Sequence, residues 1–267
     1  MSVHLGVLVI HNDPVPETEL WAMAPPGVTV HAARFDCPRE PGAEYVGSSW
    51  QAVAHAPDVV RALNHLGQLG VTGMSFCFGS PSFFGGAAFD SGFMAEATRL
   101  AGGVPVRTAA VSMTEALRAS GVRRPFVVMP PWFTEPTFVA TDRFLADNGL
   151  SMAGLLRFEL GADWRSVPPY ESFDAGARWS VNPEEVRRQV RRALPATADG
   201  VLVPGSGFRS AEAIEPLERE LGVPVITSNQ ACLWHGLRAA GHSAPVRGFG
   251  RLFGRDLPVG DPAETRS

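Results

Sequence analysis

Short apolar runs alternate with stretches of helical periodicity along the whole chain. The apolar runs, bounded by glycine, proline or polar residues, predict buried strands, because the strands of a parallel sheet are apolar on both faces. They cover residues 3–10, 28–35, 71–76, 125–129, 154–158, 201–203 and 223–226. The helical pattern predicts helices at residues 50–69, 89–101, 113–120, 134–148, 183–194, 211–221 and 230–240. This order predicts an α/β fold in which mostly parallel sheets are covered by helices.

Two of these helices carry recognisable end signals. Asn182 precedes Pro183 and Glu184, the pattern of an N-cap followed by proline at the first helical position. Asn148-Gly149 predicts the C-terminal end of the helix before it.

The sequence also contains an internal repeat. The stretch GVTGMSFCFGSPSFFGG, a helix and GGVPVRTAAVSMTEALRASG are echoed by ADGVLVPGSGFRS, a helix and LGVPVITSNQACLWHGLRAAG. Gly79-Ser80 matches Gly205-Ser206, residues 104–106 match 223–225, and residues 117–121 match 237–241. Three matches in one order predict two pseudo-symmetric halves, residues 1–112 with 228–267 and residues 113–227. We expect the active site in the cleft where the two Gly-Ser turns face each other.

Composition narrows the class of partner. The chain has 267 residues, 45% of them hydrophobic and 19% charged, and no apolar run near the roughly 20 residues of a membrane helix. Its net charge of −4 and scattered arginines give no basic stripe, which argues against nucleic acid. The first residues, MSVHLGVLVIHND, lack the basic flank and cleavage site of a signal peptide. We therefore expect a cytoplasmic protein that binds a small molecule, and leave open whether it forms homo-oligomers.

The three cysteines are expected to be reduced thiols. Cys37, Cys77 and Cys232 form no C-x-x-C pair, so neither a disulfide framework nor a zinc site is expected. The glycine-rich turns match no nucleotide fingerprint, since Gly205-x-Gly207 lacks the third glycine of G-x-G-x-x-G. The sequence predicts neither a metal nor a nucleotide cofactor.

A strand that ends in Gly-Ser and turns into a helix exposes backbone N–H groups at the positive end of a helix dipole. Two facing copies would hold a small dianion or a developing enolate. The alternative is that each Gly-Ser pair is only a tight connection with serine as the N-cap.

Several segments together resemble the aspartate/glutamate racemase superfamily, in its arylmalonate decarboxylase and maleate cis-trans isomerase branch. They are GVLVIHND with ETELWAMAPPGVTVHAARF, then SFCFGSPSFFGG, then ADGVLVPGSGFRSAEAIEPLERELGVPVITSNQACLWHGLRAAG, and finally GFGRLF. The resemblance implies two flavodoxin-like halves, no metal or cofactor, and an enolate-type intermediate held between two opposed cysteines.

The sequence departs from that family at the two cysteines. The positions that the resemblance assigns to them hold Phe78 and Gly205, and Trp132 stands where many relatives have a tyrosine. The anion-binding scaffold remains. Its residues are Ser80, Ser82, Gly205, Ser206, Arg209 and the pair Ser228-Asn229.

Two residues are candidates for proton transfer. Cys77 lies one residue before the expected nucleophile, and a one-residue slip reverses a side chain's direction, so it points into the core unless a bulge re-aims it. His11 follows the first strand beside Asn12 and Asp13, where α/β sheets place ligand-contacting residues, or it only makes a local hydrogen bond. His235 is expected to be structural.

The expected site has thirteen members. The catalytic candidates are His11, Cys77, Ser80 and Ser206, and the substrate-binding candidates are Asn12, Phe78, Gly79, Ser82, Trp132, Gly205, Gly207, Arg209 and Asn229. Phe78 and Trp132 favour an apolar or aryl substrate portion. The aromatic-rich residues 163–179 are either a lid over that portion or an ordered surface loop.

Three functions fit these observations. The first is a cofactor-independent lyase of the arylmalonate decarboxylase type, which acts on a small carboxylic acid through an enediolate protonated by His11, Cys77 or water. The second is an isomerase or racemase of the same fold, disfavoured because the resemblance implies that such reactions need the missing thiols. The third is a carboxylate-binding pseudo-enzyme that keeps the anion cradle and has lost the chemistry.

Overall fold

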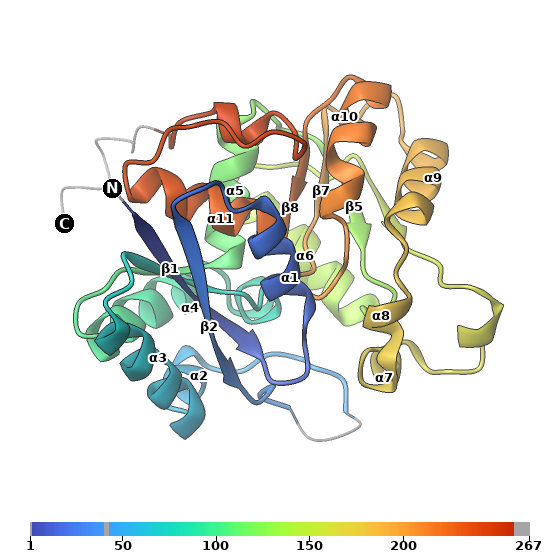
Figure 1. The fold of residues 1–267 in the computed structure, drawn as a ribbon. Coiled ribbons are helices and arrows are strands. Elements are labelled where there is room, and N and C mark those ends of the chain that lie inside the picture. Colours follow the sequence, from blue (N-terminus) through green and yellow to red (C-terminus); the bar gives the residue numbers. More distant parts are fainter. Residues whose placement is uncertain (1, 40–42, 259–267) are drawn as a thin grey trace.

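Two four-stranded parallel sheets form the centre of the protein in a computed structural model that describes residues 2–39 and 43–258 (Figure 1). The first sheet has the order β2-β1-β3-β4, with β1 (Val3–Ile10), β2 (Val28–Phe35), β3 (Gly73–Phe76) and β4 (Val106–Thr108). The second has the order β6-β5-β7-β8, with β5 (Pro125–Met129), β6 (Gly154–Arg157), β7 (Gly200–Val203) and β8 (Val225–Thr227). The predicted fold of two α/β halves with parallel sheets is confirmed.

Helices cover both sheets. They are α1 (Val15–Met23), α2 (Trp50–Ala54), α3 (Pro57–Leu69), α4 (Ser80–Leu100), α5 (Ala109–Ala119), α6 (Glu135–Asp147), α7 (Pro169–Ser172), α8 (Arg178–Ser180), α9 (Pro183–Ala193), α10 (Ile214–Leu221) and α11 (Ser228–Ala239). Short helical turns are η1 (Ala162–Trp164), η2 (Phe173–Ala177), η3 (Ala211–Ala213) and η4 (Leu252–Gly254). The predicted Asn182 cap is confirmed, because its side chain accepts the Glu184 N–H at 2.9 Å.

The structure differs from the predicted elements where proline and glycine stand inside or beside helices. The single helix expected at 50–69 is two helices, because Pro57 begins a new one. Helix α1 was not predicted, although proline in a first turn is compatible with a helix. Helix α4 starts at the Gly-Ser turn, nine residues before the expected 89, and bends at Gly86, which has φ 60°. The three-residue β4 was also missed.

The last strand of each sheet ends in the same way. Thr108 and Thr227 close β4 and β8, and each accepts an N–H of the following helix at 3.3 Å, from Val111 and Gln230 respectively. The two threonines are therefore equivalent positions of the two halves.

Strand pairing then fixes which residues correspond in the neighbouring strands. The two threonines lie opposite Phe76 and Val203, so these two are equivalent. Two residues further on, Phe78 corresponds to Gly205. The match of Gly79 with Gly205 in the repeat is therefore out by one residue, because turn sequences can match while the strand registers differ.

Helices α5 and α11 pack against each other, and α11 also contacts β3 and β8, so it lies between the two sheets (Figure 1). His235 Nε2 on α11 lies 3.0 Å from Glu115 Oε2 on α5. One buried apolar cluster contains side chains from both sheets, while a second belongs to the first sheet alone. The exact division into residues 1–112 with 228–267 and residues 113–227 stays a prediction. None of the helices in the described ranges has the length and apolar character needed to cross a membrane.

A buried carboxylate holds the first turn. Asp90 of α4 accepts hydrogen bonds from Ser82 Oγ at 2.6 Å and Thr108 Oγ1 at 2.7 Å, and all three side chains are buried. It thereby ties the start of α4 to the end of β4.

Replacing Asp90 by alanine leaves two buried hydroxyls without their charged acceptor. We expect Asp90→Ala to lower the free energy of unfolding by about 3 kcal/mol, measured by urea denaturation. Ser91→Ala, an exposed neighbour on the same helix, is the control and should change it by less than about 0.5 kcal/mol. Equal effects of the two substitutions would show that the Asp90 contacts contribute nothing.

Candidate active site

A cleft lies at the carboxyl ends of the strands, with walls from both halves of the chain. Its volume is about 780 Å³ with the open mouth included. Nine of the thirteen expected residues line it: Asn12, Cys77, Phe78, Gly79, Ser80, Trp132, Gly205, Ser206 and Gly207. The two turns do face each other, because a Cβ built on Gly79 would lie 3.5 Å from the carbonyl oxygen of Pro204.

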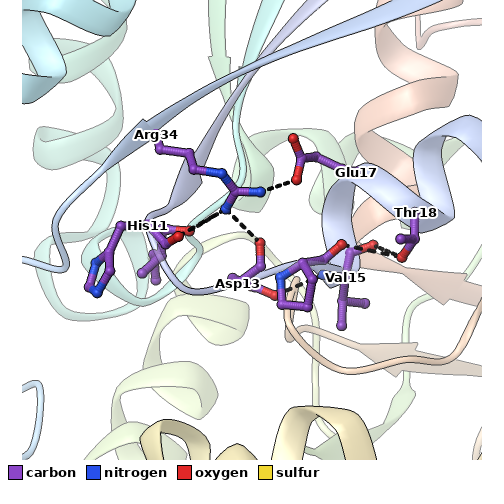
Figure 2. Close-up of polar contacts among 8 residues, drawn as sticks. His11, Asp13, Val15, Glu17, Thr18 and Arg34 are labelled. Atoms are coloured by element: carbon purple, nitrogen blue, oxygen red, sulfur yellow. Dashed lines mark hydrogen bonds and ion pairs between the residues drawn. The ribbon is translucent and has the colours of Figure 1, made fainter.

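The other four expected residues lie elsewhere. The His11 side chain points away from Asp13 (Figure 2) and does not line the cleft. Its Nδ1 lies 3.3 Å from Asp36 Oδ1 at the surface. Ser82 bonds to Asp90, and Arg209 forms an exposed ion pair with Glu212. Asn229 donates to Glu19 and to the carbonyl of Ser206, so it positions the second turn from behind.

Sequence reasoning missed the cleft residue Asp13, mentioning it only as a neighbour of His11. Its loop is fixed by Arg34 of β2, whose guanidinium donates to the carbonyls of Ile10, His11 and Asp13 at 3.1–3.2 Å and pairs with Glu17 (Figure 2). The Asp13 side chain turns inward instead, and its Oδ1 accepts the Val15 N–H at 3.0 Å. A carboxyl placed just after the first strand of an α/β sheet was the available signal.

The Asp13 carboxyl lies directly against the second turn. A Cβ on Gly207 would come within 2.8 Å of Asp13 Oδ2 and 2.7 Å of Phe173 Cε2, so only glycine fits there. Oδ2 accepts no hydrogen bond from the described part of the chain. Burial raises the pKa of Asp13 to about 7, against the lowering effects of the Val15 N–H, Arg178 and Arg34. The group thus changes charge near neutral pH while it faces the cleft.

The two turns are built differently. Gly79 precedes α4 and Ser80 is its first residue, as expected of a helix N-terminus. The second turn leads into no helix directly, since η3 and α10 begin only at Ala211 and Ile214. The expectation of two strand-to-helix turns is therefore wrong for the second. It offers its backbone N–H groups and the Ser206 hydroxyl, which lies 3.0 Å from Ser228 Oγ.

Both positions assigned to the family cysteines are closed. The Phe78 ring packs in a buried aromatic cluster with Phe35, Tyr45 and Phe76. A Cβ on Gly205 would lie only 2.3 Å from Pro130 Cγ. A cysteine at position 205 would require Pro130 to move, whereas position 78 is filled by a large ring that is part of the apolar packing.

Cys77 is part of the cleft wall and of the buried core at once, with 1% of its surface exposed. Hydrogen bonding to Cys232, together with burial, raises the pKa of its thiol. Cys77 is therefore held as a protonated thiol.

Residues 163–179, expected to be a lid or a surface loop, supply one wall through Tyr170, Phe173 and Asp174. Phe173 packs edge-on against Trp132, with 5.0 Å between ring centroids. Asp174 accepts a hydrogen bond from Asn12 Nδ2 at 2.9 Å and forms an ion pair with Arg39. These contacts fasten the segment to the first half of the chain across the cleft.

The family model for arylmalonate decarboxylase matches residues 44–253. The chain belongs to the arylmalonate decarboxylase family. It is 32% identical to the arylmalonate decarboxylase of Bordetella bronchiseptica over 198 residues, 73% of this chain and 76% of that protein. It is 25% identical to the maleate isomerase of Nocardia farcinica over 155 residues, 58% of this chain and 56% of that one.

Solved structures agree with this assignment. Unliganded arylmalonate decarboxylase superposes with a TM-score of 0.74 at 26% identity, covering 95% of this chain and 99% of the other. The maleate isomerase Iso of Pseudomonas putida S16 gives a TM-score of 0.78 at 19% identity over 95% and 99% of the two chains, a likeness in fold alone. The family to which the chain belongs thus contains enzymes, and the resemblance seen in the sequence is confirmed.

The raised pKa of Asp13 makes stability depend on pH. Between its unfolded value of 3.8 and its folded value of about 7, the native protein binds more protons than the unfolded chain, so stability falls as pH rises through that window. Between pH 4 and pH 7, we expect the free energy of unfolding of the wild-type protein to fall by roughly 4 kcal/mol relative to that of Asp13→Asn. Above pH 7 we expect no further fall. Urea denaturation of both proteins across this range measures the difference, and parallel pH profiles would contradict it.

The contact of Gly205 with Pro130 predicts that these two positions are coupled. Gly205→Cys should lower the free energy of unfolding by about 2 kcal/mol through overpacking. Adding Pro130→Ala removes the clashing ring atom. The double variant should therefore be about 1 kcal/mol more stable than the sum of the two single effects predicts. A thermodynamic cycle of the four proteins measures this, and strictly additive effects would refute the steric explanation.

Proposed function

We propose that this protein is a cofactor-independent decarboxylase of small, aryl-bearing malonic acids, and that it works in the cytoplasm. The observation that carries the proposal is a cleft lined both by hydrogen-bond donors from two facing turns and by aromatic side chains. The donors include Ser80 Oγ, which has no hydrogen-bond partner among the described residues, and the backbone of Ser206 and Gly207. Membership of the arylmalonate decarboxylase family supports the same reaction class.

The two kinds of wall have separate tasks. The turns hold the carboxylate that stays and stabilise the second negative charge that develops on it as the enediolate forms. The other carboxylate lies against rings such as Trp132 and Phe173, where a charged group loses hydration and departure as neutral carbon dioxide is favoured. The electron pair of the broken carbon–carbon bond passes into the enediolate, and no cofactor is needed to receive it.

The alternatives have less support. Maleate isomerisation and two-base racemisation, as the family resemblance implies them, need opposed thiols, and the two positions hold Phe78 and a glycine crowded by Pro130. A carboxylate-binding protein without turnover keeps the same cradle and is separated from the enzyme by an activity measurement alone.

We expect the wild-type protein to release carbon dioxide from 2-methyl-2-phenylmalonate, measured by product chromatography. Ser80→Ala should weaken binding of the product 2-phenylpropanoate by about 1–3 kcal/mol, because a hydroxyl donor to a carboxylate is lost. Ser151→Ala, an exposed serine far along the chain, is the control and should bind as wild type does. Tight binding of 2-phenylpropanoate without any turnover of aryl malonates would identify a binding protein instead.

A further inference from the structure

We propose that the Asp13 carboxyl delivers the proton that converts the enediolate into product, in place of a thiol. The inference rests on the proposed decarboxylation and adds a catalytic residue to it. It follows from where Asp13 lies in the cleft and from what surrounds the other acids.

Asp13 faces the place where the intermediate would be held. Its Oδ2 lies against Gly207 of the second turn, which the proposed function uses to bind the enediolate. The Oδ1 bond to the Val15 N–H and the Arg34 contacts to its loop keep the carboxyl in this orientation. The remaining oxygen is therefore available to the cleft, on a rigid support.

The other acids near the cleft are less suitable. His11 points to the outside and pairs with Asp36. The Cys77 thiol is buried and donates to the Ser75 carbonyl oxygen at 3.9 Å, and its pKa is raised by Cys232 and by burial. Burial raises the pKa of Cys37 to about 11. The Tyr45 hydroxyl is enclosed by protein, so it does not open into the cleft. Among the residues that line the described cleft, Asp13 combines an oxygen at the cleft wall that accepts no hydrogen bond with a pKa near neutral pH.

The surroundings keep Asp13 protonated at and below neutrality. The positive charges that face Asp13 are those of Arg34 on β2 and Arg178 on α8. The other titratable groups that face it are the Glu19 carboxyl on α1 and the Cys77 thiol after β3. Burial outweighs the two arginines and raises the pKa of the carboxyl to about 7. A neutral carboxyl carries the proton and does not repel the incoming dicarboxylate.

The step is balanced without a further reactant. Loss of carbon dioxide leaves the electron pair on the enediolate. The Asp13 O–H bond breaks, its proton forms the new carbon–hydrogen bond at the α-carbon, and Asp13 is left as a carboxylate. Water then returns a proton to Asp13 before the next turnover.

A single donor on one wall fixes the stereochemistry of the product. Asp13 reaches the α-carbon from the side of the β1–α1 loop, so the proton arrives at one face of the intermediate. Protonation from one face gives one enantiomer of 2-phenylpropanoate, and in heavy water one deuterium at the α-carbon.

The decisive variant is Asp13→Asn, which keeps the shape and the Oδ1 acceptor and removes the acidic proton. With 2-methyl-2-phenylmalonate as substrate, we expect kcat to fall about 100-fold or more, KM to stay within about threefold, and the residual product to be racemic, because water protonates it. The wild-type kcat should decrease above about pH 7, where Asp13 loses its proton. Asp36→Asn, an exposed carboxylate beside His11, is the matched control and should behave as wild type.

Product stereochemistry and binding decide the outcome. If Asp13→Asn still gives a single enantiomer, the inference about Asp13 is overturned, whatever the rate. The proposed function would nevertheless stand, provided that the wild-type protein turns the substrate over. Absence of turnover by the wild type would overturn the proposed function itself. Calorimetric affinity for 2-phenylpropanoate should weaken above pH 7 in wild type and not in Asp13→Asn. An affinity with the same pH dependence in both proteins would overturn the placement of Asp13 beside the ligand.

Discussion

The geometry of the cleft depends on one buried carboxylate, Glu19 of α1. It accepts the backbone N–H groups of Ser210 and Ala211 at 2.6 and 2.8 Å and the Asn229 amide at 2.8 Å. Burial raises the pKa of Glu19, and these three donors act against that rise. Because α1 begins just after Asp13 and Asn229 also holds the Ser206 carbonyl, this clamp sets the spacing between the two walls.

The fold was predictable because its signals are local and repeated. Apolar runs fixed most strands to within two residues, and the Asn182 cap lies where its sequence pattern placed it. Helix α1 was missed because it begins beside two prolines, although proline is tolerated in the first turn of a helix. The repeat was aligned one residue out because glycine and serine matched by type, whereas register is set by hydrogen bonding between strands that lie far apart in sequence.

The residues that line the site were largely predictable from the sequence, whereas the acid that we propose as proton donor was not. The turns and the aromatic residues lie where the motifs placed them. His11 was preferred to Asp13 because histidine titrates near neutral pH in water, whereas an aspartate does so only when buried. That burial comes from residues such as Phe173 and Gly207, about 160 positions or more further along the chain, and no local pattern reveals it.

The same apolar cleft environment accounts both for the residues that replace the two cysteines and for the raised pKa of Asp13. Aromatic residues that enclose the cleft lower the local dielectric, which favours departure of carbon dioxide and at the same time keeps a carboxyl protonated near neutral pH. Phe78 extends this apolar wall into one cysteine position, and Pro130 closes the other. A thiol at either cysteine position would have to keep its proton beside the same turns that bind the anion. Asp13 instead approaches from the β1–α1 loop and leaves both turns to the substrate. In the proposed reaction, the same environment therefore supplies the driving force for bond cleavage and the acid that protonates the intermediate.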